Sequence, residues 1–531
     1  MLLKSKNLLE LSHPSYTIAG RPIRVLIIFP PSHRAVKAMW TIHNETKNSS
    51  IGAKPPLGPM YVAAYLKAHT PHEIKILDCQ VENSSDEDIK KYIETYQPHL
   101  VGICAWTEYW YDSWQCIQIA KAVDPNIHVA VGGPHIGIYP ELTLEHSGCD
   151  SVIVGDGEVP FYWLSNAISN GTLPADLPGL HMKSHGVKQD DLKFYIHGEL
   201  DTLTPPMRDM LPYKKYTNVI GQSDYVTTMI TSRGCPFRCT FCKLAFQKTL
   251  SHSAEYVIEE FQRIYDMGIK EIQVYDDTFT WSKKRLIQIC QGIVERGIKV
   301  DWAIRDRVSS PTPETMEWLA KAGCTRIHYG VESGSDKTLQ TIKKNITTAQ
   351  ALNAFKLAKS FGMQTLAYFM IGLPGETIED MRETFRFAKK LDADYATFSV
   401  TVPYAGTEIY DEALRRGVIP TDYWAEYAKN PMPNFVLPYF YEEHLNKEEL
   451  LKLRDEGTRQ FYFRPRYMWR ELKKIRSMTE LKRKAKMALN VFQTSILRAG
   501  NKIYLHGVEA NPSPVPVKYA NNQANPHSVR E

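Results

Sequence analysis

The sequence predicts an α/β protein with two successive domains of parallel strands, a doubly wound sheet and then a partial barrel, followed by a helical region. Two observations predict this fold class. Short apolar runs alternate with segments of helical spacing over residues 22–165 and again over 225–430, and a proline-rich stretch at 166–224 separates them. Because strands separated by helices form parallel sheets covered by helices, each repeat of this rhythm indicates one such domain.

Length and composition fit this organisation. At 531 residues the chain exceeds one ordinary core, and 43% hydrophobic with 23% charged residues is typical of soluble globular proteins. Residues 1–20 lack the apolar core of a signal peptide, and nine cysteines without paired spacing indicate a reducing compartment, so we expect a cytoplasmic protein. The expected parts are an extension (1–21), a first domain (22–165), a linking subdomain (166–224), a partial barrel (225–430), a helical C-terminal region (431–500) and a disordered tail (501–531).

The first domain should contain five strands, at residues 23–29, 74–77, 100–105, 127–131 and 151–154, with helical spacing at 60–66 and 114–123. Small and cyclic residues follow four of them: Pro30-Pro31-Ser32, Ala105-Trp106-Thr107, Gly132-Gly133-Pro134-His135 and Gly155-Asp156-Gly157-Glu158. Ligands of parallel sheets bind at this edge. Neither phosphate-binding glycine motif is present, so the loops suit a broad, flat ligand, unless they are ordinary turns.

The second domain should contain six strands, at residues 225–231, 271–275, 300–305, 326–331, 365–371 and 396–402. Between the first two strands, Val257, Phe261 and Ile264 share one helical face and Gly268 is placed to end that helix. Six strands cannot close as an eight-stranded barrel does, so we expect an open side. The reaction centre should lie at the carboxyl ends of these strands.

Three cysteines, Cys235, Cys239 and Cys242, follow the first of these strands within eight residues. A four-iron cluster takes one thiolate per iron, so three thiolates leave one iron open to another ligand. His252 could instead complete a Cys3His zinc site, and a coincidental loop or a disulfide knot is the remaining alternative. The other six cysteines are scattered singly, mostly in apolar stretches.

The spacing C-x3-C-x2-C, with Phe241 directly before the last cysteine, resembles that of the radical S-adenosylmethionine (SAM) enzymes. The resemblance implies a 4Fe-4S cluster on the three cysteines and SAM at the strand ends 275–277, 330–335 and 372–376. The residues it implies around SAM are Asp277 at the ammonium, Glu332 and Ser333 at the ribose or carboxylate, and Gly372 with the Phe241 backbone at the adenine. Without the resemblance, Asp276 and Asp277 could also hold a divalent metal or be solvated turn residues.

The ordered set of Pro30-Pro31, Lys54-Pro-Pro-Leu-Gly58, Gly132-Gly-Pro-His135 and Gly155-Asp-Gly-Glu158 resembles the flavodoxin-like cobalamin-binding domain that precedes some radical SAM barrels. The cobalamin residues implied are Pro31, Ser32, Trp106, Thr107, Gly132, Gly133, His135, Gly155 and Glu158. The D-x-H-x-x-G loop that supplies a cobalt-binding histidine in methionine synthase-type domains is absent. We therefore expect cobalamin to bind without a protein imidazole on cobalt. His135 is the one imidazole close enough in sequence to contradict this expectation.

Together the two resemblances imply a cobalamin-dependent radical SAM enzyme that methylates an unactivated carbon of a small molecule, with electrons from a donor such as ferredoxin or flavodoxin. An oxidative or ring-forming cyclase, like the anaerobic magnesium-protoporphyrin monomethyl ester cyclase, is the alternative reaction. A non-enzymatic corrinoid or metal sensor is the alternative of another class. The candidates for substrate contact or catalysis are Tyr275, Trp302, Arg305, Tyr329 and Tyr404, each of which could also be barrel packing.

The C-terminal region concentrates positive charge. Residues 464–486 hold ten Lys and Arg and two Glu, a net charge of +8, whereas the whole chain carries +5. Ser477-Met-Thr-Glu480 is a capping-box pattern, and the helix it predicts places Leu481, Ala485, Ala488, Phe492 and Ile496 on one face. Residues 464–497 could therefore lie on the inner face of a membrane beside a lipid-like substrate, or pack on the barrel with a solvated basic side. Nucleic acid is the weaker reading, because no recognition motif accompanies the charge.

Overall fold

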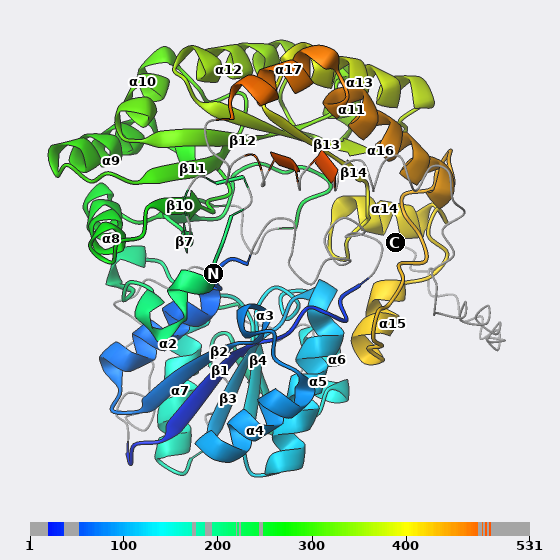
Figure 1. Ribbon diagram of the computed structural model, residues 1–531. Helices are drawn as coiled ribbons and strands as arrows, with labels where there is room; N and C mark the ends of the chain where they lie inside the picture. The colour runs from blue at the N-terminus through cyan, green and yellow to red at the C-terminus, as the bar shows by residue number, and fades with distance from the viewer. Residues whose placement is uncertain are drawn as a thin grey trace, which may run out of the picture.

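Two six-stranded sheets form the protein, one in each predicted α/β domain (Figure 1). The computed structural model describes residues 20–36, 53–172, 177–185, 194–218, 220–221, 223, 225–243, 248–475, 481, 484–485 and 488–489. Within this part of the chain, no helix is long and apolar enough to cross a membrane.

The first sheet has the order β2-β1-β3-β4-β5-β6. Its strands are β1 (Arg24–Phe29), β2 (Glu73–Asp78), β3 (Leu100–Cys104), β4 (His128–Gly132), β5 (Ser151–Ile153) and β6 (Leu180–Met182). Strands β1 to β5 are parallel, and their order is that of flavodoxin-like doubly wound sheets, as predicted. The antiparallel edge strand β6 comes from the stretch expected to be a linker, so that stretch extends the first sheet.

Helices cover both faces of the first sheet because its strands are apolar on both sides. The helices are α2 (Leu57–His69), α3 (Cys79–Glu82), α4 (Asp86–Tyr96), α5 (Trp110–Val123), α6 (Pro140–His146) and α7 (Glu158–Ser169). Val25 and Ile27 of β1 share a core with residues of α2 and α7, whereas Leu26 and Ile28 share another with residues of α4 and α5. Alternate residues of one strand thus enter two different cores.

The second sheet is entirely parallel and follows the chain in the order β14-β13-β12-β11-β10-β7. Its strands are β7 (Thr227–Met229), β10 (Glu271–Val274), β11 (Asp301–Asp306), β12 (Cys324–Glu332), β13 (Gln364–Ile371) and β14 (Tyr395–Val400). The intervening helices are α8 (Ala254–Asp266), α9 (Lys283–Glu295), α10 (Pro313–Lys321), α11 (Asp336–Thr341), α12 (Thr348–Ser360) and α13 (Ile378–Leu391). Because β7 and β14 are edges of the sheet and do not pair with each other, the barrel is partial, as predicted.

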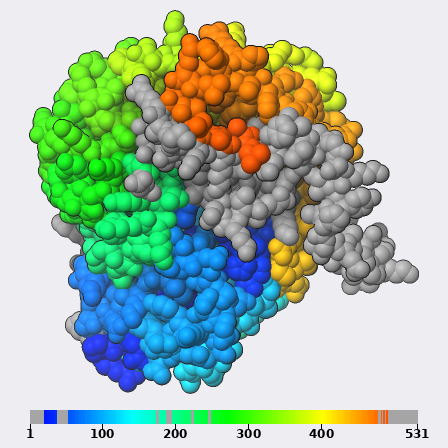
Figure 2. All heavy atoms as spheres, viewed as in Figure 1, coloured from blue at the N-terminus to red at the C-terminus, as the bar shows by residue number. Residues whose placement is uncertain are grey.

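The chain after β14 returns to both domains. Its helices are α14 (Glu408–Arg415) and α15 (Tyr423–Lys429), which end the range predicted for the barrel, and α16 (Lys447–Tyr462) and α17 (Pro465–Lys473) of the predicted C-terminal region. Helix α16 packs on β14 and α13, and it lies with α17 at the surface over the barrel (Figure 2, orange). Helix α15 instead reaches the first domain, where Trp110 Nε1 donates to the Ala428 carbonyl at 2.9 Å and Tyr111 N donates to Tyr427 Oη at 3.2 Å.

The amphipathic helix expected after residue 477 falls mostly outside the described residues, as do its capping box, Phe492 and Ile496. Leu481, Ala485 and Ala488 of its apolar face are described, and all three are exposed.

Candidate active site between two sheets

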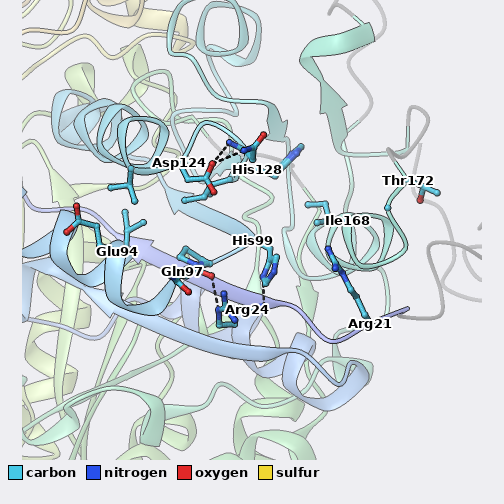
Figure 3. Close-up of a pocket in the computed structure, with 15 residues that line it drawn as sticks. Arg21, Arg24, Glu94, Gln97, His99, Asp124, His128, Ile168 and Thr172 are labelled. Carbon is cyan, nitrogen blue, oxygen red and sulfur yellow. Dashed lines mark hydrogen bonds between the residues drawn. The ribbon is translucent and has the colours of Figure 1, made fainter.

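The carboxyl edges of the two sheets are where ligands of such folds bind. A cavity of about 820 Å³ lies at the opposite, amino edge of the first sheet, beside Arg24, His99 and His128 (Figure 3). Its polar groups already have partners: Arg24 Nε donates to the Gln97 carbonyl at 2.7 Å, and the His128 ring is 2.9 Å from Ser151 Oγ. The candidate site therefore lies at the carboxyl edges.

The cysteine loop is carried by a small hairpin at the end of β7. Its arms are β8 (Ser232–Arg233) and β9 (Leu250–Ser251), which pair antiparallel, and Cys235, Cys239 and Cys242 lie between them. The hairpin is too short for its strands to be predicted from sequence periodicity.

Asp276, at the carboxyl end of β10, fixes the base of this hairpin. Its fully buried carboxylate accepts from Thr231 N at 2.6 Å, Thr231 Oγ1 at 2.5 Å and Ser232 Oγ at 2.6 Å. Arg285 of α9 adds donations to the Thr231 and His252 carbonyls, both at 2.8 Å. These contacts leave Asp276 committed to the loop, which argues against a divalent metal shared by Asp276 and Asp277.

The three cysteines differ in exposure, since Cys235 is buried, Cys239 half-buried and Cys242 exposed. Arg307, at the end of β11, lies over the Phe237 ring at 3.6 Å and is 3.8 Å from Cys239 Sγ. Partial desolvation in the loop, together with the neighbouring Cys239, Asp277 and Cys235, raises the pKa of Cys242 to about 11. Compensating positive charge is therefore needed before Cys242 loses its proton, as on metal binding.

Among the described residues, no three His, Cys, Asp or Glu side chains stand together as a ready-made metal site. The thiols would have to converge on a cluster, which a loop held mainly at its base permits. His252 lies at that base, where its ring stacks on Tyr256 at 3.9 Å and its Nδ1 is 3.2 Å from Asp201 Oδ1. These contacts do not favour the Cys3His zinc alternative.

The residues expected around SAM separate into two groups. Asp277 is exposed beside the cysteine loop, and Phe241 is half-buried in that loop, with Lys344 Nζ 5.7 Å from its ring centroid. Glu332 ends β12 with a φ of +67° and pairs with Lys344 at 2.7 Å. Lys344 thus links the loop and β12, and it was not predicted from the sequence.

Ser333 and Gly372 belong to the second group, behind this surface. Ser333 is fully buried, with its hydroxyl 3.2 Å from Thr384 Oγ1 and accepting from Ser335 N. Gly372, with a φ of +72°, faces Leu450 of α16 so closely that a Cβ would lie 2.9 Å from Leu450 Cδ2. The predicted contact of the Ser333 side chain with SAM is therefore not supported, whereas Gly372 retains only its backbone for such a role.

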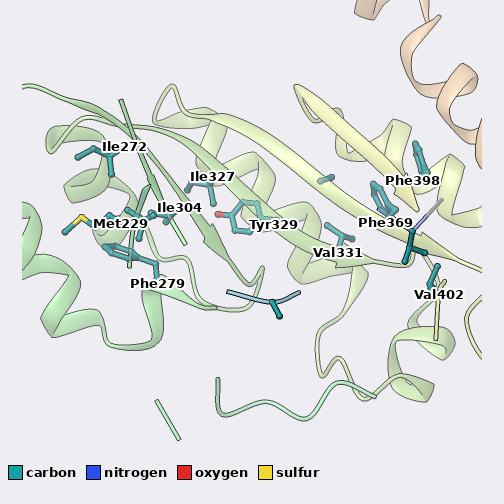
Figure 4. Packing of buried hydrophobic residues seen from close by; sticks show 14 of the residues in the cluster. Met229, Ile272, Phe279, Ile304, Ile327, Tyr329, Val331, Phe369, Phe398 and Val402 are labelled. Carbon is teal, nitrogen blue, oxygen red and sulfur yellow. The ribbon is translucent and has the colours of Figure 1, made fainter. Parts of the chain in front are cut away.

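Strand alternation divides the predicted substrate residues, and two predictions are corrected. Tyr329 of β12 is fully buried against Phe355 of α12, on the outer side of the sheet (Figure 4). Trp302 of β11 is also fully buried, packing on Phe261 and Phe279. Both residues are therefore barrel packing.

The inner side of the barrel is polar. Arg305 of β11 is exposed there and lies 4.1 Å from the centroid of the Tyr275 ring. His328 and Tyr368 of the next strands are 3.0 Å apart. Tyr404, after β14, is 3.1 Å from Glu108 of the first domain. Of the candidates, Tyr275 and Arg305 thus line the barrel, and Tyr404 lies at the domain boundary.

In the first domain, a cavity of about 250 Å³ opens at the carboxyl ends of β1, β3, β4 and β5. It is lined by apolar side chains and by glycines that include Gly102, Gly132, Gly133 and Gly155, and on the barrel side by Ile230 and Arg233. Gly133 has a φ of +100°, and a Cβ there would lie 2.7 Å from the Ala105 carbonyl. A cavity of this volume is too small for all of cobalamin, so part of that cofactor would lie on the loops above it.

Of the nine predicted cobalamin residues, Gly132, Gly133, Gly155 and Glu158 line this cavity, and Pro31, Ser32, Trp106, Thr107 and His135 do not. His135 is fully buried, stacked on Trp110 at 4.2 Å and 3.2 Å from Thr107 Oγ1. Burial lowers the pKa of His135 to about 3. The predicted contacts of His135 and Thr107 with the cofactor are therefore not supported, and cobalt without a protein imidazole stays a prediction.

Glu158 has a partner that sequence reasoning missed. Arg233, two residues before Cys235, pairs with Glu158 at 2.6 Å and with Asp156 at 2.8 Å. The pair joins the hairpin of the second domain to the cavity of the first.

The comparisons agree with this architecture. The B12 binding domain model matches residues 50–164, and the radical SAM superfamily model matches residues 229–388. An uncharacterized methyltransferase of Pyrococcus horikoshii is 35% identical over 85% of this chain and 95% of its own. The anaerobic magnesium-protoporphyrin IX monomethyl ester cyclase of Rubrivivax gelatinosus is 27% identical over 78% and 75%. The structure of the radical SAM methyltransferase TsrM from Kitasatospora setae, with cobalamin and a [4Fe-4S] cluster, matches 74% of this chain and 78% of that chain with 18% identity and a TM-score of 0.59.

Proposed function

The chain belongs to the cobalamin-dependent radical SAM enzymes, and we propose that it is a methyltransferase that acts on an unactivated carbon of a lipid-like or other small-molecule substrate. The observation that carries the proposal is the shared cavity: glycine loops of the first sheet form one side, and Ile230 and Arg233, directly before the cysteine loop, form the other. A methyl carrier and a radical source must both reach one carbon, so their sites have to face each other.

The cofactors are a 4Fe-4S cluster, SAM and cobalamin. When bound, they supply a 5′-deoxyadenosyl radical from SAM and a methyl group from cobalamin. The chain contributes positions. Asp277 is an exposed carboxylate beside the cysteine loop that can accept from the SAM ammonium, and Lys344 holds Glu332 at the end of β12. Arg305 and Tyr275 line the barrel, where they can orient a substrate.

Anaerobic reconstitution with iron, sulfide and cobalamin tests this function. A methyltransferase of this kind yields both 5′-deoxyadenosine and S-adenosylhomocysteine when SAM and a reductant are supplied. The electrons would come from an external donor such as ferredoxin or flavodoxin. Formation of 5′-deoxyadenosine without S-adenosylhomocysteine would contradict methyl transfer and favour a cyclase, the reaction named for the relative from Rubrivivax gelatinosus.

The lipid-like substrate is supported by the surface of α17. Met468, Trp469 and Leu472 are 48%, 62% and 57% exposed, and they fall on one face at helical spacing. Arg466 and Lys473 are exposed beside them. By contrast, Arg470 and Lys474 pair with Asp392 and Asp394 of the barrel at 2.8 and 2.7 Å. One side of the helix thus packs on the barrel, and the other combines apolar and basic groups as interfacial helices do.

Sedimentation with anionic vesicles at low salt tests membrane contact. The full chain should bind, and the variant Trp469→Ser/Leu472→Ser should bind at least about tenfold more weakly, because two apolar anchors are lost. Trp281→Ser is a matched control, since Trp281 is 42% exposed on another part of the barrel. No binding at all, or equal binding after deletion of residues 464–531, would refute the membrane proposal while leaving the methyltransferase reaction untouched.

A further inference from the structure

Arg233 lies between the two cofactor sites, and the proposed reaction assigns it no role. It stands in the β8 arm of the hairpin, two residues before Cys235, and its side chain is 13% exposed. Its guanidinium reaches out of the second domain to Asp156 at 2.8 Å and Glu158 at 2.6 Å, and it lies 5.3 Å from the centroid of the Tyr61 ring of α2. All of its named partners are residues of the first domain.

The two carboxylates are themselves fixed. Gly155 turns the chain with a φ of +98° and approaches Tyr195 so closely that a Cβ would lie 2.1 Å from the Tyr195 carbonyl. Asp156 uses its second oxygen to accept from His197 N at 2.8 Å. The sequence Gly155-Asp-Gly-Glu158 is therefore a rigid receptor for a guanidinium, set on the rim of the cavity.

The hairpin is held from two sides as a result. Asp276 and Arg285 bind Thr231 and Ser232 to the barrel. The next residue, Arg233, binds the hairpin to the first domain. Burial favours the neutral form of Glu158, but Arg233 outweighs it and holds the pKa of that carboxyl below its usual range. Burial raises the pKa of the neighbouring Asp156, so the shift at Glu158 is the one that favours the ion pair.

We propose that Arg233 is a positioning residue that locks the cysteine loop onto the cobalamin-binding domain, and so sets the distance and angle between SAM and cobalamin. The inference rests on the proposed function. A buried ion pair contributes less to stability than well-packed apolar groups of similar size, but its paired hydrogen bonds fix geometry. That property suits a junction where two reacting groups must meet.

The consequence concerns one step, the methylation of added cob(I)alamin by SAM. In it the cobalt supplies the electron pair of the new bond to the methyl carbon, and the sulfur keeps the electrons of the broken bond and leaves as S-adenosylhomocysteine. The step needs SAM and cobalamin in register across the domain boundary. Reductive cleavage of SAM to 5′-deoxyadenosine does not need the first domain, so the loss of Arg233 should slow methyl transfer more than SAM cleavage.

The test compares these two products in the reconstituted enzyme, with titanium(III) citrate as reductant and cob(I)alamin as methyl acceptor. Arg233→Gln should lower the ratio of S-adenosylhomocysteine to 5′-deoxyadenosine about a hundredfold, since displacements near 1 Å have effects of that size. Arg233→Lys should recover part of the loss. Arg296→Gln is the matched control, because Arg296 pairs with Glu255 and Glu259 on an exposed helix surface.

A second variant, Arg233→Met/Asp156→Asn/Glu158→Gln, distinguishes a loss of positioning from a folding defect. It removes all three charges and leaves no buried ion unpaired. It should keep the wild-type melting temperature and iron content, lose methyl transfer as Arg233→Gln does, and show faster hydrogen exchange in residues 232–251 of the cofactor-free protein. Equal product ratios in wild type and this variant would overturn the proposal. Absence of S-adenosylhomocysteine in the wild type would instead overturn the proposed function.

Discussion

The carboxyl edges of the two sheets face each other, but they consist of different types of residue. The first sheet offers glycines and apolar side chains, with Gly132, Gly133 and Gly155 around its cavity. The second offers charged and polar side chains, with Asp277 and Arg305 exposed toward its ligands. The first edge thus recognises shape through close backbone approach, whereas the second recognises charge. The two edges should therefore fail in different ways when they are mutated.

The largest expected effect comes from the cysteine loop. Replacement of Cys235, Cys239 or Cys242 by Ala should abolish 5′-deoxyadenosine formation and lower bound iron, because each thiol supplies one ligand of a site with three. Cobalamin binding by the first sheet should persist. Cys290→Ala, at a buried thiol of α9, serves as the control. Stoichiometric zinc that stays bound to the reduced protein would contradict the cluster.

The corresponding substitution in the first sheet tests cobalamin binding. Gly133→Ala should weaken aquocobalamin binding by about tenfold or more, because an L-residue at a φ of +100° is strained and its Cβ would lie 2.7 Å from the Ala105 carbonyl. Iron content should not change. Gly58→Ala is matched to it, since Gly58 lines the same cavity and a Cβ there meets nothing within 4 Å. Equal affinities of the two variants, measured by equilibrium dialysis, would disprove the shape argument.

Substitutions of two neighbouring carboxylates of the second sheet should distinguish support of the cysteine loop from binding of SAM. Asp276→Asn should reduce iron retention and lower stability by about 1–3 kcal/mol, because an amide offers one acceptor oxygen where three donors converge. Asp277→Asn should leave the melting temperature unchanged and raise KM for SAM about tenfold. Thermal unfolding and initial rates measure the two effects. A variant of Asp276 that loses only SAM affinity would reverse these assignments.

The smallest effect is a pH dependence that belongs to the second sheet. Burial raises the pKa of Glu376, after β13, to about 8. The folded state therefore holds this proton more tightly than the unfolded chain, so the stability it contributes is lost as pH rises from about 4.5 to about 8. In urea unfolding at pH 6 and pH 8, Glu376→Gln should reduce the difference in the free energy of unfolding between the two pH values. The exposed Glu408→Gln should not change this difference. An unchanged difference in Glu376→Gln would exclude Glu376 as the cause.

Sequence patterns predicted every parallel strand of the two six-stranded sheets, because buried parallel strands are apolar runs bounded by turn residues. The alternation of polar and apolar residues also indicates where Tyr329 lies. In β12 the polar Arg326 and His328 alternate with the apolar Ile327, Tyr329 and Val331, so a period of two already assigns Tyr329 to the outer, helix-covered side.

Other features were beyond sequence reasoning for physical reasons. The strand β6 has three residues and the hairpin β8–β9 has arms of two, which is too short for periodicity to appear. The pairing of Arg233 with Glu158 joins residues 75 positions apart and exists only once the domains dock. The positions of Ser333 and His135 depend on which side of a loop faces a neighbouring helix, and the residue type does not specify it.

The return of α15 to the first domain bears on how a substrate enters. The two domains are joined at the hairpin by Arg233 and again, far along the chain, where Ala428 accepts from Trp110. A pair of bodies fastened at two separate points cannot swing apart as a hinge does. The relative placement of the two carboxyl edges is then set by contacts at both ends of the second domain, and a substrate has to fit the space that these contacts leave between the sheets.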